Sequence, residues 1–93
     1  MKPVVFTERA KKRLIETSLY IFEKTKSAEK ADEFLDEMQR YIVSQLNAFP
    51  RIGREAPEFG AGVRKLVYRR YTILYIIEKN RYVVITLFRE NLP

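Results

Sequence analysis

A long helical repeat of apolar residues constrains the fold of this 93-residue chain more than any other feature of its sequence. Ser27 can cap the start of this segment with its hydroxyl, and Pro50 ends it because proline lacks the N–H that a continuing helix needs. We therefore predict a helix of about 20 residues, roughly 30 Å long. The apolar residues recur at spacings of three or four, which is typical of a helix with one buried face: Ala28, Ala31, Leu35, Met38, Ile42, Leu46 and Phe49.

A shorter pattern of the same kind precedes this helix. Thr7 is the candidate N-cap, and the helix is expected to run to about Lys24. Because only residues 25–27 separate the two helices, they should form an antiparallel hairpin. The predicted buried face of the first helix consists of Ala10, Leu14, Thr17, Tyr20 and Ile21.

Runs rich in β-branched and aromatic residues follow the hairpin and predict strands. Tight turns are expected at Arg69–Arg70 and at Lys79–Asn80, and Asn80 can adopt the left-handed conformation. The strands separated by these turns should pair as an antiparallel meander. Their predicted ranges are 63–68, 71–77 and 82–88.

Two further segments complete the predicted fold. Residues 2–6 are short and β-branched and predict a first strand, whereas residues 51–62 hold all three glycines and predict a long loop. We expect a single α+β domain over residues 1–93, in which an N-terminal strand precedes the helical hairpin and a three-stranded antiparallel meander packs on that hairpin.

The predicted strands are apolar on both faces. Strict alternation places Tyr71, Ile73, Tyr75 and Ile77 on one face, and it separates Val83, Ile85 and Leu87 from the other residues of 82–88. One face should carry the hairpin. The other is unusually apolar for open solvent and implies a groove or a covering partner.

The composition excludes several kinds of site. The chain has no cysteine and no histidine, so it can form no disulfide, thiolate nucleophile, imidazole base or Cys/His metal site. It also lacks a phosphate-binding glycine motif, a serine elbow and a carboxylate cluster for a divalent cation. We expect no metal and no cofactor, and the catalytic residues, if any, stay unknown. With no signal region and no apolar run near 20 residues, a soluble cytoplasmic domain is expected.

Positive charge gathers in the second part of the chain. Residues 51–93 carry nine basic and four acidic side chains, against nine and eight in residues 1–50, so this part holds most of the net charge of +6. Most of its cations are arginines, which suit phosphate and carboxylate. Arg64, Tyr71 and Arg89 are candidates to converge at one end of the meander as an anion-binding site. The alternative is ordinary sheet packing with arginines reaching to solvent.

At these residues the sequence resembles the ParE/RelE superfamily of bacterial toxin–antitoxin toxins, over almost the whole chain. The segment 46–53 is similar to the family's helix exit of leucine, proline and glycine. The segments 62–66 and 71–75 are similar to its "G-x-R-x-L" and "Y-x-I-x-Y" motifs, and Arg89 followed by Pro93 is similar to its basic ending.

The resemblance implies one of two activities. ParE-like members interfere with DNA gyrase, whereas RelE-like members cut messenger RNA on the ribosome with basic residues plus a tyrosine or histidine. Thr72 stands where RelE-like members typically have an arginine, and histidine is absent, so the resemblance is closer to ParE. A third possibility is a module that binds its antitoxin without being toxic.

The resemblance also implies partners and contact residues. We expect a cognate antitoxin, which covers the apolar groove with an amphipathic helix and an added strand, and DNA gyrase as the target, with ribosome and mRNA as the alternative. We expect neither a membrane partner nor a small-molecule substrate. The antitoxin contacts are expected at Tyr75, Tyr82, Val84 and Phe88. The target contacts are expected at Arg64 and Arg89 first, then at Lys65, Arg69, Arg70 and Tyr71.

Overall fold

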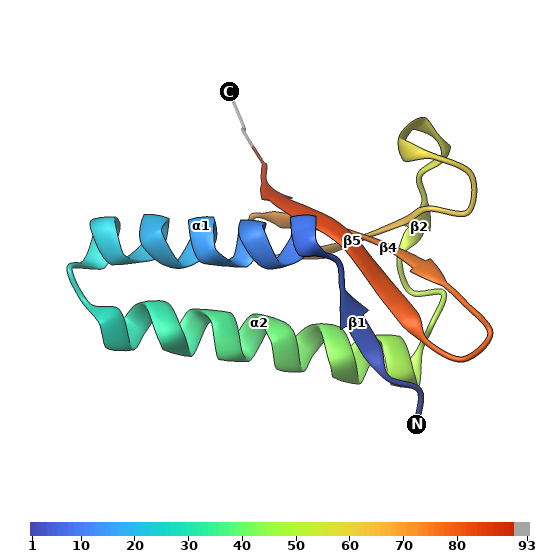
Figure 1. Cartoon of the computed structure of the whole chain (residues 1–93), viewed down its shortest axis with the longest axis horizontal. Coiled ribbons are helices and arrows are strands. Elements are labelled where there is room, and N and C mark those ends of the chain that lie inside the picture. The colour runs from blue at the N-terminus through green and yellow to red at the C-terminus, as the bar shows by residue number, and fades with distance from the viewer. Residues whose placement is uncertain (91–93) are drawn as a thin grey trace.

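The computed structural model describes residues 1–90, in which a strand leads into two long helices and then a series of strands (Figure 1). Pro93, part of the predicted basic ending, lies outside the described residues. The elements are β1 (Val4–Phe6), α1 (Glu8–Thr25), α2 (Ala28–Ala48), β2 (Arg54–Glu55), the short 3-10 helix η1 (Pro57–Phe59), β3 (Arg64–Tyr68), β4 (Tyr71–Ile77) and β5 (Tyr82–Arg89).

The predicted helical hairpin is confirmed, and capping side chains fix where both helices begin. The Thr7 hydroxyl accepts a hydrogen bond from the Ala10 N–H at 3.1 Å, and the Ser27 hydroxyl accepts one from the Lys30 N–H at 3.1 Å. Lys26 ends α1 in the left-handed conformation, at φ 58°. These caps satisfy backbone groups that the helix ends leave free and reverse the chain within two residues.

The sheet has more strands than the predicted meander. Its order is β1-β5-β4-β3-β2, so β3, β4 and β5 form the expected antiparallel meander at its centre. β1 adds to β5 in parallel, with Val4 opposite Tyr82, and β2 adds to β3, with Glu55 opposite Arg64. The prediction that residues 51–62 form only a loop is therefore wrong. A two-residue strand is too short to show an alternating pattern.

The two turns of the meander also differ from each other. Arg69 adopts the left-handed conformation, at φ 54°, between β3 and β4. Asn80 is not among the described residues with positive φ, so it does not use the left-handed conformation that an asparagine can adopt. The chain instead closes the second turn with a hydrogen bond from the Glu78 N–H to the Arg81 carbonyl, at 2.9 Å.

A β-bulge at Ile85 breaks the predicted alternation of β5. Leu74 lies opposite Thr86 and Tyr75 lies opposite Val84, which leaves Ile85 as the extra residue. A bulge turns the following side chains to the other face of a sheet. Leu87 consequently joins the same core as Val84, and Arg89 lies opposite Tyr71.

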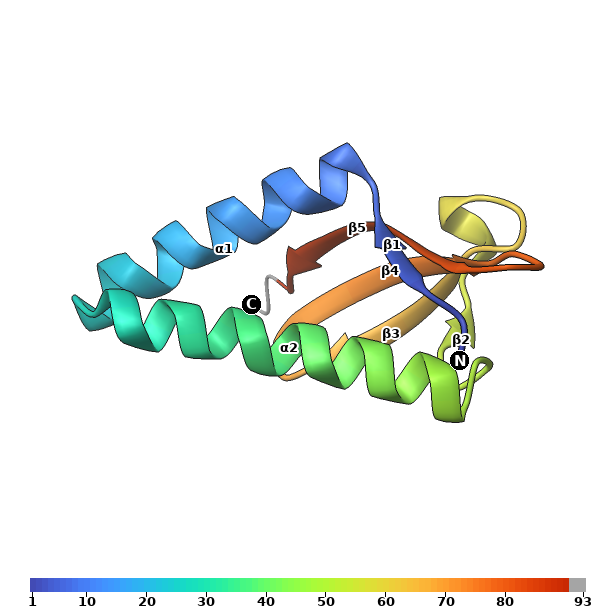
Figure 2. The same cartoon turned by 60° about the horizontal axis from the view of Figure 1, so that its bottom comes forward.

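The hairpin packs on one face of the sheet and forms the main core there (Figure 2). A smaller cluster lies on the other face, where Ala56 and Val63 pack on Leu74. The segment containing β2 and η1 thus covers part of the apolar face for which a partner was expected. The side chains of the main core that are fully buried include Met38, Ile42, Leu46, Ile73, Tyr75, Val84 and Leu87.

Candidate functional site

Two adjoining cavities lie where β4 begins and β5 ends, beneath α1. One measures about 370 Å³ and the other about 250 Å³, and both are lined by Tyr20, Tyr71 and Arg89. We call the two cavities together the Tyr71 site. Arg13, Glu16, Thr17, Leu87 and Phe88 complete the larger cavity, and Ile21, Phe34, Arg69 and Arg70 complete the smaller one.

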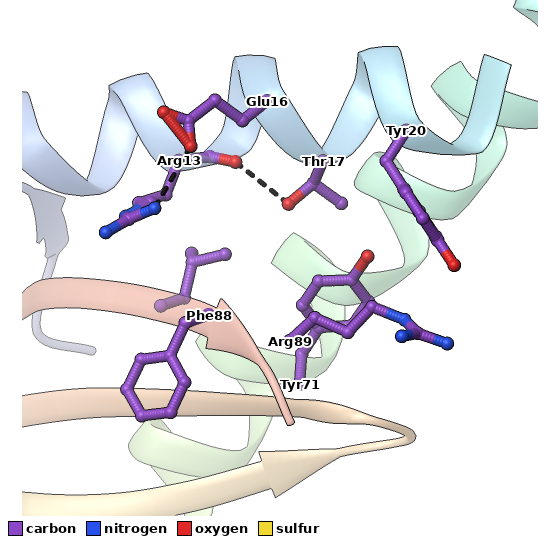
Figure 3. A pocket seen from close by; sticks show the side chains of 8 residues that line it. Arg13, Glu16, Thr17, Tyr20, Tyr71, Phe88 and Arg89 are labelled. Atoms are coloured by element: carbon purple, nitrogen blue, oxygen red, sulfur yellow. Dashed lines mark hydrogen bonds and ion pairs between the residues drawn. The ribbon is translucent and has the colours of Figure 1, made fainter. Parts of the chain in front are cut away.

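In the larger cavity of the Tyr71 site, α1 and the strands each supply one side (Figure 3). Strand pairing places Tyr71 opposite Arg89, and one turn of α1 brings Thr17 and Tyr20 above them. The hydroxyl of Tyr71 points toward α1, and the guanidinium of Arg89 extends toward Tyr20. The Arg89 guanidinium carbon lies 5.0 Å from the centroid of the Tyr20 ring, a cation–π contact.

The arginines of the Tyr71 site are poorly neutralised. Arg13 pairs with Glu16 at 3.1 Å and Arg69 with Glu37 at 3.5 Å, but both pairs are largely exposed, where an ion pair contributes under about 1 kcal/mol. Within residues 1–90, no carboxylate lies within 4.0 Å of the guanidinium of Arg70 or Arg89. The site therefore presents positive charge that an anion can neutralise.

Tyr71 carries a buried hydroxyl in the site, next to the buried Thr17. Burial raises the pKa of its hydroxyl above the ordinary value of 10.0, while the neighbouring Thr17 hydroxyl and the charge of Arg89 act in the opposite direction. The phenol therefore keeps its proton at neutral pH. It offers a hydrogen-bond donor to a bound anion rather than a base.

The structure brings together part of the predicted target set. Arg69, Arg70, Tyr71 and Arg89 all line the smaller cavity, although the prediction did not include the helix residues that complete it. Thr17 and Tyr20 were predicted only as members of the buried face of the first helix. Their helical spacing was the one available signal, and it could not show that they face Arg89.

Arg64 does not join the Tyr71 site, and its predicted convergence with Tyr71 and Arg89 is wrong. Because β3 and β4 are antiparallel, Arg64 lies opposite Tyr75, at the other end of β3 from the turn that precedes Tyr71. Its Nε donates to the Gly53 carbonyl at 2.9 Å, and its side chain is only 15% exposed. Arg64 ties the β2 segment to the sheet.

Lys65 is also separate from the site. It pairs with Leu74, which belongs to the smaller cluster on the face away from the hairpin, and with Arg54 of β2. Alternation along β3 places Lys65 on the opposite face from Arg64 and Leu66. The six predicted target residues thus divide among three places.

The predicted antitoxin residues share no exposed face. Tyr75, Tyr82 and Val84 are at most 4% exposed beneath the hairpin, so they offer almost no surface to a partner. Phe88 lies beyond the bulge on the other face, near Phe59, with ring centroids 6.2 Å apart. The chain's own helices cover three of the four residues, and their contact with an antitoxin stays an untested prediction.

An exposed apolar stripe on α1 was missed. Ile15, Leu19 and Phe22 are 62%, 60% and 43% exposed, at the spacing of one helical face. The signal was present in the sequence, because these apolar residues do not belong to the predicted buried face of the helix. This stripe, which we call the α1 stripe, is an exposed apolar surface, and other exposed apolar side chains such as Phe49, Phe59 and Val67 lie elsewhere on the described chain.

The described residues include no group of acidic side chains that could hold a metal ion. Neither of the two long helices in residues 1–90 has the stretch of apolar sequence that crossing a membrane would require.

Comparisons with known proteins place the chain in a family. The model of the family described as ParE toxin of type II toxin-antitoxin system, parDE, matches residues 4–90. A solved structure, described as the chromosomal ParDE TA system from P. aeruginosa, superposes with a TM-score of 0.77 over 98% of both chains, at 17% identity. No curated protein matches the sequence. The fold is thus that of the ParDE structure, and since the family model spans nearly all of the described domain, the chain belongs to the ParE toxin family of type II toxin–antitoxin systems.

Proposed function

We propose that this ParE-family toxin inhibits growth by binding DNA gyrase, and that a cognate antitoxin neutralises it. The observation that supports the proposal most is the match of the ParE toxin family model to residues 4–90. The Tyr71 site is our candidate for the surface that contacts the target, because three of its arginines are exposed beside one cavity.

Inhibition by binding suits the chemistry of the Tyr71 site. Its guanidinium groups keep their protons and donate hydrogen bonds to anions. The Tyr71 phenol, with its raised pKa, is a further donor. These groups favour a bound negative charge on the target, and they favour tight association rather than proton transfer.

The α1 stripe is our candidate for antitoxin binding. An amphipathic helix can lay its apolar face on Ile15, Leu19 and Phe22, and an acidic one would complement the net charge of +6. Replacing Leu19 with Ser should weaken antitoxin binding at least tenfold while the chain still inhibits growth. Ser18→Ala, on the neighbouring helix position, is the control. Unchanged antitoxin affinity in Leu19→Ser would remove this assignment.

A supercoiling assay with purified gyrase tests the target. Saturating toxin should reduce supercoiling, Arg89→Ala should lose most of this inhibition, and Lys79→Ala should keep it. The two variants lose the same charge, but Lys79 lies in the turn at the opposite end of β4 from Tyr71. Normal supercoiling at saturating toxin would contradict the gyrase proposal.

Growth experiments distinguish the remaining possibilities. Codon-phased cuts in transcripts after induction would identify ribosome and mRNA as the target. Unimpaired growth with the antitoxin still bound would identify a chain that has kept its partner and lost its toxicity.

A further inference from the structure

Arginines alternate with aromatic rings along the Tyr71 site. Arg89 stacks on Tyr20, and the Arg69 guanidinium carbon lies 5.4 Å from the Tyr68 ring centroid and 5.7 Å from that of Phe34. Phe34 in turn lies 5.5 Å from Tyr71, centroid to centroid. Proteins bind single-stranded nucleic acid with this combination, in which rings stack on bases and cations follow the phosphates.

We infer that the Tyr71 site binds single-stranded nucleic acid, with a phosphate held by Arg70 and Arg89 and a base stacked beside Tyr20. The inference goes beyond the proposed function, because such binding requires no gyrase and is measured without it.

The two arginines come from neighbouring segments of the backbone and line the same cavity. The Glu90 N–H donates to the Arg70 carbonyl at 2.7 Å, so the turn before β4 and the end of β5 lie side by side. Both arginines line the smaller cavity, and neither has a carboxylate within 4.0 Å among residues 1–90. Guanidinium groups beside one cavity can bind a phosphate through several charge-assisted hydrogen bonds.

The shape of the site favours a strand with separated bases. The cavities of about 370 Å³ and 250 Å³ share Tyr20, Tyr71 and Arg89 as lining residues. Neighbouring nucleotides of one strand can therefore occupy the two cavities, one on each side of these three residues. The larger cavity lies between α1 and the sheet (Figure 3), and Phe34 of α2 also lines the smaller one. Paired bases in a duplex have their faces covered by stacking, so only an unpaired base can present its face to Tyr20.

An acidic peptide is the competing ligand, because an extended peptide can pair with the open backbone edge of a sheet. β1 pairs only with Tyr82–Val84 of β5, so the stretch 86–89 beside the larger cavity has no strand on that side among the described residues. The side chains favour nucleic acid, since four arginines and four aromatic residues line the two cavities and the rings give a base a surface to stack on. Glu16 is the one carboxylate among these lining residues.

Fluorescence anisotropy with a labelled twelve-nucleotide oligo-dT and the purified chain tests the inference. Arg89→Ala and Tyr20→Ala should each weaken binding about tenfold, while Tyr20→Phe, which keeps the ring, and Lys79→Ala should stay within about twofold of the parent chain. In a salt titration, Arg89→Ala should lower the slope of log K against log salt by about 0.7, the value of one phosphate contact on a single strand. Circular dichroism melts confirm that each variant is folded.

Three results would overturn the inference. Equal losses in Arg89→Ala and Lys79→Ala would mean that only net charge matters. Tighter binding to a duplex of the same length would exclude an unpaired ligand, and tighter binding to a glutamate-rich peptide of equal charge would identify a protein ligand. Supercoiling measured on the same variants separates gyrase inhibition from nucleic-acid binding. The toxin can inhibit gyrase without binding oligo-dT, and it can bind oligo-dT without inhibiting gyrase.

Discussion

The hydroxyl of Tyr75 joins the helix exit to the sheet, and replacing Tyr75 with Phe should destabilise the toxin more than the loss of one oxygen suggests. The hydroxyl accepts a hydrogen bond from the Gly53 N–H at 3.0 Å and donates one to the Pro50 carbonyl at 2.8 Å. Gly53 and Tyr75 are both buried, so no water replaces the lost oxygen without rearrangement. A buried donor left without a partner costs about 1–3 kcal/mol.

The expected loss in the free energy of unfolding is about 2 kcal/mol. For a domain of this size each kcal/mol lowers the melting temperature by about 4–8 °C, so Tyr75→Phe should melt roughly 8–16 °C lower. Tyr41→Phe is the control, because the Tyr41 hydroxyl makes no hydrogen bond with the described residues. Thermal melts and urea titrations followed by circular dichroism measure both variants. If they melt within about 2 °C of each other, the Tyr75 hydroxyl does not hold this junction.

Three further predictions follow from other contacts. Arg64→Ala removes the donor to the Gly53 carbonyl and should lower the free energy of unfolding by about 1–3 kcal/mol in urea titrations. The folded variant should inhibit gyrase as well as the parent chain does. If it is as stable as the parent chain but no longer inhibits gyrase, Arg64 is a target contact after all. Burial raises the Tyr71 pKa, so the folded state holds its phenol proton more tightly than the unfolded state. The free energy of unfolding should therefore fall as the pH rises above about 10. In urea titrations at pH 9 to 11, Tyr71→Phe should show a smaller fall than the parent chain. If the free energies of the two chains fall in parallel with pH, this prediction is wrong. Ser27→Ala removes one helix cap and should lower the free energy of unfolding by about 1 kcal/mol. Thr7→Ala should lower it further, because the Thr7 hydroxyl caps α1 and also donates to the Ile85 carbonyl. Equal urea midpoints for the two variants would show that the bond to Ile85 contributes nothing.

The helical hairpin was predictable because its signals are local. The apolar repeat of α2, the caps at Thr7 and Ser27, and the stop at Pro50 each act within a few residues. The strands of the meander were predictable for the same reason, since the turn at Arg69 joins neighbours in sequence. β1 pairs with a strand more than seventy residues away, and no local pattern shows that partner.

The role of Arg64 could not be predicted from residue type. A guanidinium reaches far enough to bind either an external phosphate or a nearby carbonyl, and the sequence does not show which is within reach. Here the loop after α2 brings the Gly53 carbonyl to 2.9 Å from Nε. The same loop approaches Tyr75 so closely that a Cβ on Gly53 would lie 2.7 Å from its ring. Arg64 of the "G-x-R-x-L" motif and Gly53 of the helix exit thus contact each other, and the contact is structural.

The bulge at Ile85 places Arg89 in the candidate site. Without the extra residue, strict alternation from Val84 would direct Phe88 toward the hairpin and Arg89 away from it. With it, Phe88 packs on the smaller cluster, while Arg89 lies opposite Tyr71 and stacks on Tyr20. Ile85 has no partner residue on β4, and its carbonyl accepts instead from the Thr7 hydroxyl; the same extra residue places a guanidinium beside a buried phenol. Bulges are frequent next to functional sites because they redirect one side chain in this way, which independently favours the Tyr71 site over Arg64 as the surface that meets the target.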